Sequence, residues 1–333
     1  MPKPTLSEYL EVLRELFRQY QQAHPEVPRR GAPFTYTQIS LLVLFAVMTI
    51  RHLYGAKAQR RWLLAHPDAC SQFGLEQVPS RWTLRRRWQQ LYPTVQGFVA
   101  FLGAWTDDLD TAFDGSDQFI DKSLWKAAGP VWHQKDRAAG RIPEGLRNLD
   151  TDASWSKSAY HGWVYGYGGH WRTTQGACPV AVEIETASVS EAAIIDRQAE
   201  TIFAQAPQTV TGDNSYCNLK RVRTWAKHDV ALITSAVKVK ADSPQGGPYK
   251  AFVKQPDNQA LLQRRGTATE PVFDLIAQLI GAGDNQKQLP VKGLANVRTC
   301  LAMGTLLAQL AMIVNSSWGL PLREISQMIA VFT

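Results

Sequence analysis

Residues 113–125, FDGSDQFIDKSLW, and residues 209–216, TVTGDNSY, determine how the second half of the chain is interpreted. In the first stretch the apolar pair Phe119-Ile120 precedes Asp121, and in the second Val210 precedes the turn that carries Asp213. Apolar and β-favouring residues of this kind, bounded by Gly and Asp, are typical of short strands. We therefore expect strands over 119–125 and 209–212, with Asp121 on the first strand and Asp213 at the end of the other.

The segments around these two stretches predict the fold class. Further strands are expected over 162–173, 180–186 and 230–237, and helices over 190–205, over 218–228 and from Glu270, where Pro271 suits a first helical turn. The order is three strands followed by helix, strand, helix, strand and helix. Three such strands can form an antiparallel meander, and the last two can join it in parallel through helical crossovers. This predicts an α/β fold with an RNase H-like core, a mixed five-stranded sheet with flanking helices.

The segments at both ends of the chain have helical patterns. Apolar residues recur at helical spacing over 6–17, and more helices are expected over 37–50, 57–65, 80–91, 94–107 and 295–315. The apolar runs 39–50 and 301–314 are shorter than the ~20 residues that span a membrane, so we expect buried helices and no membrane. The pattern predicts an all-α N-terminal DNA-binding domain over 1–110, a catalytic domain over 111–285, and C-terminal helices over 286–333 that pack on the core.

Composition limits the classes of protein that the chain can belong to. The 333 residues include 36 Lys and Arg against 29 Asp and Glu, a net charge of +7, which is compatible with a polyanionic partner. The four cysteines form no CxxC pair, which argues against a zinc ribbon or a disulfide scaffold and favours a reducing compartment. No GxSxG elbow and no P-loop occur, so a serine hydrolase and an ATPase are poor alternatives.

Three acids occupy the elements where a metal-dependent phosphoryl-transfer enzyme needs them. Asp121 lies on the first strand, Asp213 follows the fourth, and Glu270 opens the helix after the fifth. Mg²⁺ and Mn²⁺ favour carboxylate ligands, and two such ions can clamp the attacking and leaving oxygens of an in-line displacement. Most of the 29 acids are surface charges, and a helix dipole alone favours an acid at position 270. The joint placement of the three is therefore the signal.

These residues carry a resemblance to a known family. In chain order, the chain resembles the Asp-Asp-Glu (DDE) transposases of bacterial insertion sequences in residues 119–136 (FIDKSLWKAAGPVWHQKD), 150–171 (DTDASWSKSAYHGWVYGYGGHW), 210–225 (VTGDNSYCNLKRVRTW) and 270–280 (EPVFDLIAQLI). Residues 79–88, PSRWTLRRRW, resemble the basic helix common in their N-terminal domains. The resemblance implies an RNase H-like core with Mg²⁺ or Mn²⁺ that cuts at the ends of its own element and joins the 3′-OH to target DNA.

The resemblance assigns catalytic and metal-binding roles to Asp121, Asp213 and Glu270. Asp114 and Asp117 are rivals of Asp121, which is preferred because it follows the apolar pair and lies well inside the strand. Many members of the family carry an Arg four residues before the glutamate and a Lys seven after it, whereas this chain has Gly266 and Ala277 there. This departure implies other phosphate contacts or a weakened enzyme.

Three groups of basic residues are predicted to contact DNA. They are Arg81, Arg85, Arg86 and Arg87; Lys220, Arg221, Arg223 and Lys227; and Arg264 and Arg265. Lysine and arginine neutralise phosphates and release counterions, and this makes DNA affinity depend on salt. A solvated helix face is the alternative for each group.

The leading hypothesis is a DDE transposase that acts on element ends and target DNA. Pairing two ends implies at least a homodimer, and the absence of an apolar targeting segment predicts a cytoplasmic, nucleoid-associated protein. One rival is a domesticated metal-dependent nuclease on the same fold, which cuts without joining. Another is a catalytically inactive DNA-binding protein, and a paired-carboxylate glycosidase is a distant alternative.

Overall fold

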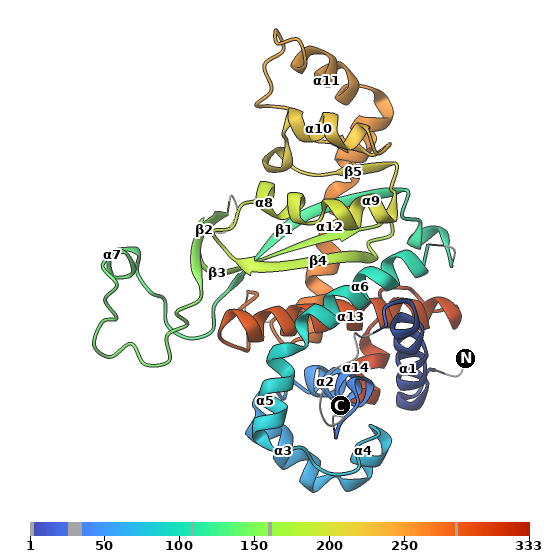
Figure 1. Ribbon diagram of the computed structural model, residues 1–333, viewed down its shortest axis with the longest axis vertical. Coiled ribbons are helices and arrows are strands. Elements are labelled where there is room, and N and C mark those ends of the chain that lie inside the picture. The colour runs from blue at the N-terminus through green and yellow to red at the C-terminus, as the bar shows by residue number, and fades with distance from the viewer. Residues whose placement is uncertain (1–2, 26–34, 108, 159–161, 284–285) are drawn as a thin grey trace.

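The computed structural model describes residues 3–25, 35–107, 109–158, 162–283 and 286–333 of a mixed α/β protein. A mixed sheet occupies the middle of the elongated molecule, with the N-terminal helices and α13 at one end and α10 and α11 at the other (Figure 1). The helices are α1 Leu6–Ala23, α2 Gln38–Ile50, α3 Ala56–Ala65, α4 Pro67–Gln72, α5 Arg81–Gln90, α6 Tyr92–Trp105, α7 Gln134–Ala138, α8 Glu191–Arg197, α9 Ala199–Gln205, α10 Leu219–Ala226, α11 Gly246–Val253, α12 Pro256–Leu279, α13 Leu294–Ser317 and α14 Ser326–Phe332.

The sheet has the strand directions that the sequence pattern predicts. Its strands are β1 Asp117–Lys126, β2 Ser154–Ser158, β3 Gly162–Thr173, β4 Pro179–Thr186, β5 Thr209–Thr211 and β6 Ala231–Ile233. Strands β1, β3 and β4 form an antiparallel meander, and β5 and β6 join the other edge of β1 in parallel. The main order is therefore β4-β3-β1-β5-β6.

Strand β2 makes the sheet six-stranded rather than five-stranded, which corrects the predicted number. It has the polar sequence SWSKS. It pairs with the first five residues of β3, on the opposite side of β3 from β1. A short polar strand gives no alternating apolar signal, so sequence reasoning missed it. Strand β6 is shorter than predicted because Thr234 bonds Tyr249 Oη and Ala236 has a left-handed φ of 52°.

The two faces of β1 pack against different helices. Phe119 packs with Leu261 and Ala268 of α12, whereas Ile120 packs with Ile195 of α8 and Trp225 of α10. This is the alternation expected of successive strand residues. Asp121 shares the parity of Phe119 and therefore lies on the face that α12 covers.

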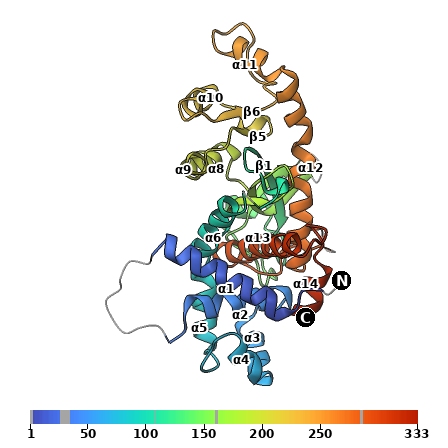
Figure 2. The same ribbon diagram turned by 90° about the vertical axis from the view of Figure 1, so that its right-hand side faces the viewer.

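Helix α12 begins at Pro256 rather than at Glu270, so the predicted helix start is wrong. Pro271 lies inside this 24-residue helix, although proline lacks the N–H that would bond the carbonyl of Thr267. Thr267 is exposed, and water can therefore satisfy that carbonyl. Because Glu270 is in mid-helix, the helix dipole no longer explains an acid there. Figure 2 shows α12 running from α11 past the sheet toward α13.

A continuous apolar core joins the ends of the chain to the sheet. Buried residues of α1, α2, α6, α12 and α13 form one cluster with Trp125, Trp171 and Ile184 of the sheet. Trp171 donates from Nε1 to Thr305 Oγ1 of α13 at 2.8 Å. The boundaries predicted at residues 110 and 285 separate kinds of sequence pattern, but the core runs across both.

Helix α13 is the centre of this core. By length and composition it is apolar enough to cross a membrane, but 94% of its most apolar window is buried inside the protein. Its N-cap residue, Gly293, has no side chain that could cap the helix. Two acids from another segment accept from backbone N–H groups at this end instead: Asp150 from Gly293 N at 3.1 Å and Asp152 from Leu294 N at 2.9 Å. The helix is therefore the core helix that the sequence predicts, and these contacts anchor the loop before β2.

Candidate active site

Strand register brings Asp121 and Asp213 to the same level on neighbouring strands. Phe119 of β1 pairs with Thr211, the last residue of β5. Asp121 lies two residues further along β1, and Asp213 lies two residues past the end of β5. Gly212 N still donates to Ile233 O at 3.0 Å, which keeps the end of β5 alongside β6. Asp213 also raises the pKa of Asp121, as expected for two nearby carboxylates.

Asp121 is held by three donors. Lys122 N donates to Oδ1 at 2.8 Å, and Arg265 Nη1 donates to Oδ2 at 2.5 Å. Thr269 Oγ1 lies 3.4 Å from the same Oδ2. Arg265 and Thr269 are four residues apart on α12, so one face of that helix meets the carboxylate.

Burial is the main influence on the Asp121 carboxyl and raises its pKa above the usual value. The Arg265 guanidinium opposes this shift most strongly, followed by the hydrogen bond from Lys122 N. The Asp121 side chain retains 19% of its exposure and that of Arg265 retains 29%. The pair therefore lies at the edge of the interior, where other cations can reach the carboxylate.

Asp213 forms the turn that follows β5. Its Oδ1 accepts from Ser215 N at 2.7 Å and caps the short 3-10 turn Asn214–Tyr216. The next residue, Asn214, has a buried Oδ1 with no hydrogen-bond partner in the structure. The turn after β5 thus carries a carboxylate and, at the next residue, a buried amide oxygen that has no hydrogen-bond partner.

Glu270 is exposed and lies on α12 beside Gly266. A Cβ added at Gly266 would be 3.7 Å from Glu270 Oε1, so the side chain lies back along the helix toward the level of Arg265. Glu270 acts electrostatically on Lys287, as Asp121 does. Lys287 is therefore close enough to both Glu270 and Asp121 to feel the charge of each carboxylate.

Lys287 is a site residue that sequence reasoning missed. Burial lowers its pKa, while Asp274, Glu270 and Asp121 act to raise it. Its Nζ donates to Ser123 Oγ at 3.2 Å and lies 4.0 Å from Asp274 Oδ1. The sequence shows only that a lysine follows the glutamate's helix, because its position depends on how the chain returns to β1.

The backbone around Lys287 has an unusual conformation. Gln286 and Lys287 have left-handed φ values of 51° and 61°, which cost stability in residues other than glycine. Pairing with β1 holds this conformation: Lys126 N donates to Lys287 O at 3.0 Å, and Leu289 N donates to Lys126 O at 2.9 Å. The chain thus places this lysine at the edge of β1 that β5 leaves open.

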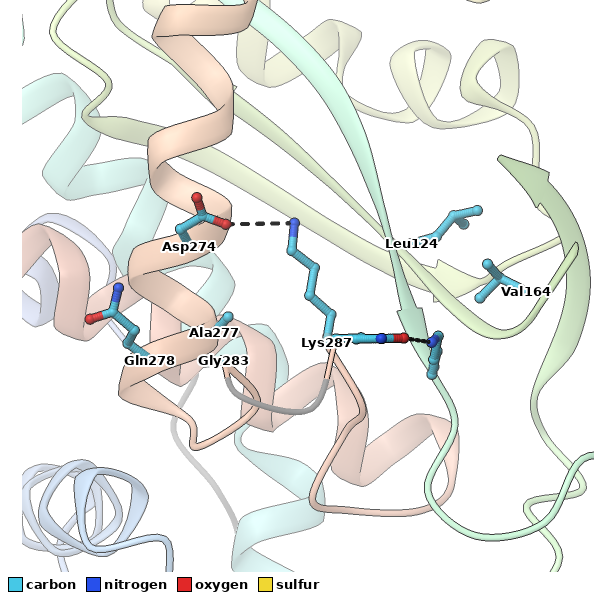
Figure 3. A pocket seen from close by; sticks show the side chains of 9 residues that line it. Leu124, Val164, Asp274, Ala277, Gln278, Gly283 and Lys287 are labelled. Atoms are coloured by element: carbon cyan, nitrogen blue, oxygen red, sulfur yellow. Dashed lines mark hydrogen bonds and ion pairs between the residues drawn. The ribbon is translucent and has the colours of Figure 1, made fainter. Parts of the chain in front are cut away.

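A cavity of about 520 Å³ adjoins Lys287. Figure 3 shows Lys287 reaching toward Asp274 between α12 and β1, with Leu124 and Val164 on the strand side. Lys126 also lines the cavity, and its Nζ donates to Gln286 Oε1 at 2.6 Å. Two lysines beside an apolar floor suit a ligand that carries both negative charge and an apolar ring.

The residues near Asp121 fit a hard divalent cation in part. Asp121, Asp213 and the unpartnered Asn214 Oδ1 are oxygen donors of the kind that Mg²⁺ prefers. However, among the residues that the structure describes, no three His, Cys, Asp or Glu side chains are grouped so as to hold a metal ion. Arg265 lies on the Asp121 carboxylate, and Glu270 is turned along α12.

The rivals of Asp121 are placed differently. Asp117, the first residue of β1, accepts from Thr209 Oγ1 at 2.7 Å. Asp114 precedes the strand and accepts from Ser116 N at 2.8 Å. Asp117 is level with Thr209, four residues before Asp213, so the register favours Asp121 as the acid that shares a site with Asp213.

Several predicted DNA contacts are exposed. Arg81, Arg85 and Arg86 of α5 lie on the surface, and so do Lys220, Arg223, Lys227 and Arg264, whereas Arg87 is half-buried. Trp82, which the sequence reasoning did not single out, is 68% exposed among the arginines of α5. Helix α5 therefore presents an aromatic and cationic surface.

One of the predicted DNA contacts, Arg221, is wrong because the residue is buried, and a second, Arg265, is engaged within the protein. Arg221 is 6% exposed and donates to Asp196 Oδ1 at 2.8 Å, to Tyr216 O at 2.8 Å and to Ala192 O at 3.1 Å. It is a structural residue, because all three partners are within the protein. Arg265 bonds Asp121 rather than pointing outward like Arg264.

The positive charge of the chain is concentrated beyond the sheet edge. Residues 217–264, which include α10 and α11 and are termed the basic lobe, hold nine basic and three acidic residues, a net charge of +6 out of +7 for the chain. The basic residues are Lys220, Arg221, Arg223, Lys227, Lys238, Lys240, Lys250, Lys254 and Arg264. Helix α12 begins in this lobe and leads to Asp121.

Comparison with known proteins finds no family model, no curated protein and no solved structure that matches this chain.

Proposed function

We propose that this protein is a DNA transposase of the DDE class, acting by metal-dependent phosphoryl transfer. The observation that carries the proposal is the placement of Asp121 and Asp213 at one level of the parallel pair β1 and β5. The order β4-β3-β1-β5-β6, with an antiparallel meander and two parallel strands, agrees with an RNase H-like core. Glu270 on α12, next to the same strand, is the third acid of the proposal.

The proposed chemistry assigns a task to each residue near the site. Asp121 and Asp213, with Glu270 after a side-chain rotation, would hold Mg²⁺ or Mn²⁺, which when bound activates the nucleophilic oxygen and neutralises charge on the phosphate. Lys287 and Lys126 present ammonium groups at the open edge of β1, where they can contact a DNA phosphate. The basic lobe supplies the charge that holds the DNA backbone beside that edge.

The partner in this proposal is duplex DNA. A net charge of +6 in 48 residues produces a local positive potential, and DNA is a polyanion that such a surface attracts. The exposed arginines and Trp82 of α5 form a second surface at the other end of the molecule (Figure 1). Two separated basic surfaces suit a protein that handles more than one DNA segment.

The central experiment uses linear duplex DNA that carries the genomic sequences flanking the coding region. We expect cleavage and strand joining in Mg²⁺ or Mn²⁺, and Asp213→Asn should lower cleavage by about a hundredfold or more, since metal catalysis supplies several kcal/mol. Asp242→Asn, at an exposed position in the basic lobe, is the matched control. Cleavage without joining would instead identify a nuclease, and binding without either product an inactive DNA-binding protein.

A second experiment distinguishes the first aspartate from its rivals. Asp121→Ala is expected to remove single-turnover cleavage of the same DNA, because only Asp121 lies level with Asp213. Asp114→Ala and Asp117→Ala should lower the rate at most several-fold. An inactive Asp117→Ala beside an active Asp121→Ala would show that the site is built four residues earlier on the strand.

A further inference from the structure

Arg265 forms an ion pair with Asp121, the first of the proposed metal ligands. Arg265 Nη1 donates to Asp121 Oδ2 at 2.5 Å, and Thr269, one turn further along α12, lies 3.4 Å from the same oxygen. Arg265 is also the strongest of the influences that oppose the effect of burial on Asp121. It is therefore the counter-ion of this carboxylate.

A guanidinium and a divalent cation make competing demands on a carboxylate. Each Asp121 oxygen is already engaged, Oδ1 by Lys122 N and Oδ2 by Arg265. The Lys122 bond comes from the adjacent backbone amide and leaves room for one further ligand on Oδ1. Oδ2, by contrast, faces α12 and meets the Arg265 guanidinium, whose positive charge would repel a metal ion bound a few ångströms away.

We propose that Arg265 competes with the divalent cation for Asp121, so that metal binds only when the Arg265 guanidinium leaves this carboxylate. The inference rests on the proposed function in that it takes Asp121 and Asp213 as metal ligands. It assigns to Arg265 a positioning role rather than a catalytic one, and it makes the DNA contact that the sequence suggested depend on release of Arg265 from Asp121.

The structure allows Arg265 to leave. Its side chain is 29% exposed, and Asp121 is its only ion-pair partner among the described residues. The neighbouring residue on α12 is Gly266, beside which the Glu270 carboxyl lies. A rotation of the arginine outward would thus bring it near Glu270 and the exposed side of the helix, where Arg264 already lies.

Released from Asp121, the guanidinium can bind a phosphate. Arginine pairs with phosphate in the same two-pronged geometry that it uses for carboxylates. A DNA strand along α12 would therefore favour the released side chain, and metal binding and DNA binding would each promote the other. The contact thereby limits metal loading in the absence of DNA.

The test is direct measurement of Mn²⁺ binding to the full-length protein without DNA, by the electron paramagnetic resonance signal of free Mn²⁺. Arg265→Gln is expected to raise Mn²⁺ affinity about tenfold, the factor expected if the guanidinium occupies Asp121 about nine-tenths of the time. Arg265→Lys, which retains a charge, should remain close to the wild type. Arg18→Gln, which removes an exposed arginine that pairs with Glu15 on α1, is the matched control and should not change affinity.

Thermal unfolding with and without Mn²⁺ distinguishes competition for Asp121 from a purely structural role of Arg265. Without metal, Arg265→Gln should lower Tm by about 2–4 °C, because Asp121 loses its counter-ion. Mn²⁺ should then raise the Tm of Arg265→Gln more than that of the wild type, so that the difference between them narrows or reverses. A purely structural role predicts a Tm deficit that Mn²⁺ leaves unchanged, and that result would overturn the proposal.

Mn²⁺ binding by the variants separates failure of the Arg265 proposal from failure of the proposed metal site. If Asp213→Asn removes Mn²⁺ binding but Arg265→Gln leaves affinity at the wild-type value, the metal site stands and competition by Arg265 is wrong. If neither the wild type nor Arg265→Gln binds Mn²⁺ at millimolar concentrations, both this inference and the metal-dependent function are wrong.

Discussion

Helices α5 and α10 have similar sequences in one respect, a cluster of basic residues around tryptophan, yet they use those residues in opposite ways. In α5 the buried residues are Leu84 and Trp88, and the arginines at 81, 85 and 86 are exposed. In α10 the buried residues are Arg221 and Trp225. An arginine thus takes the core position in α10 that a leucine takes in α5.

The difference arises from what each helix packs against. The face of α10 that Arg221 occupies meets α8 and the turn after β5, which offer one carboxylate and two backbone carbonyls. Three acceptors can satisfy a guanidinium that has lost water. Leu84 of α5 instead joins the apolar core. A basic cluster therefore indicates a DNA contact only where its arginines lie off the buried stripe.

The largest expected effect that tests this comparison is on stability. Arg221→Ala should lower the free energy of unfolding by about 3 kcal/mol, because it removes three hydrogen bonds and leaves the Tyr216 and Ala192 carbonyls without the donor that satisfies them. Urea denaturation of the variant and of Arg223→Ala, an exposed residue of the same helix, measures the difference. A loss below about 0.5 kcal/mol for Arg221→Ala would place α10 in the same class as α5.

The second effect is on DNA binding by α5. Replacing Arg85 and Arg86 together with Ala should reduce the slope of log affinity against log salt concentration by about one to two units, since each phosphate contact adds nearly one. The free energy of unfolding should change by less than about 0.5 kcal/mol, as is usual for surface residues. An unchanged slope would make the exposed arginines a solvated helix face.

Trp82 should contribute less to DNA binding than Arg85 and Arg86 together. Its ring is 68% exposed and is therefore available to contact DNA at little cost to stability. Trp82→Ala should weaken binding by about 1 kcal/mol, or roughly fivefold, at the lower end of what an aromatic side chain contributes by stacking on a base. Fluorescence anisotropy with a labelled duplex that ends in a single-stranded overhang, whose bases are open to stacking, measures binding by Trp82→Ala and by the conservative variant Trp82→Phe. Equal losses in both variants would contradict a stacking contact.

The smallest expected effect concerns the partner of Arg221. The Asp196 side chain is 64% exposed, so solvent screens its ion pair, and two carbonyls still accept from Arg221 when the carboxylate is removed. Asp196→Ala should therefore cost about 0.5 kcal/mol or less. A loss close to that of Arg221→Ala would show that the carboxylate, rather than the carbonyls, makes burial of this arginine possible.

Much of the sheet could be predicted from residue pattern. The apolar pair before Asp121, the alternation over 180–186 and the Val210 strand gave the meander and the parallel additions correctly. The polar strand β2 and the true start of α12 could not be predicted, since SWSKS has no apolar period and Pro271 resembles a helix-start signal. Both errors come from local rules that tertiary packing overrides.

In the candidate site, the positions of the two aspartates could be predicted from the sequence, whereas those of Arg265 and Lys287 could not. Asp121 and Asp213 each follow apolar strand residues, and strand register then brings them together. The positions of Arg265 and Lys287 depend on how α12 crosses the sheet and how the chain returns to pair with Lys126. No local pattern in the sequence encodes those distances.

By itself, the sequence determined the five main strands, their order, and the positions of Asp121 on β1 and Asp213 just after β5, because apolar periodicity and turn residues act over a few neighbouring positions. Only the tertiary structure decided which arginines are buried, which carboxylate has a counter-ion and where the lysine after α12 points. These depend on contacts between residues up to 144 and 164 positions apart, as for Arg265 with Asp121 and Lys287 with Ser123. Burial and pairing of a charged side chain are properties of those contacts, since they depend on the water that folding removes and the partner that it supplies.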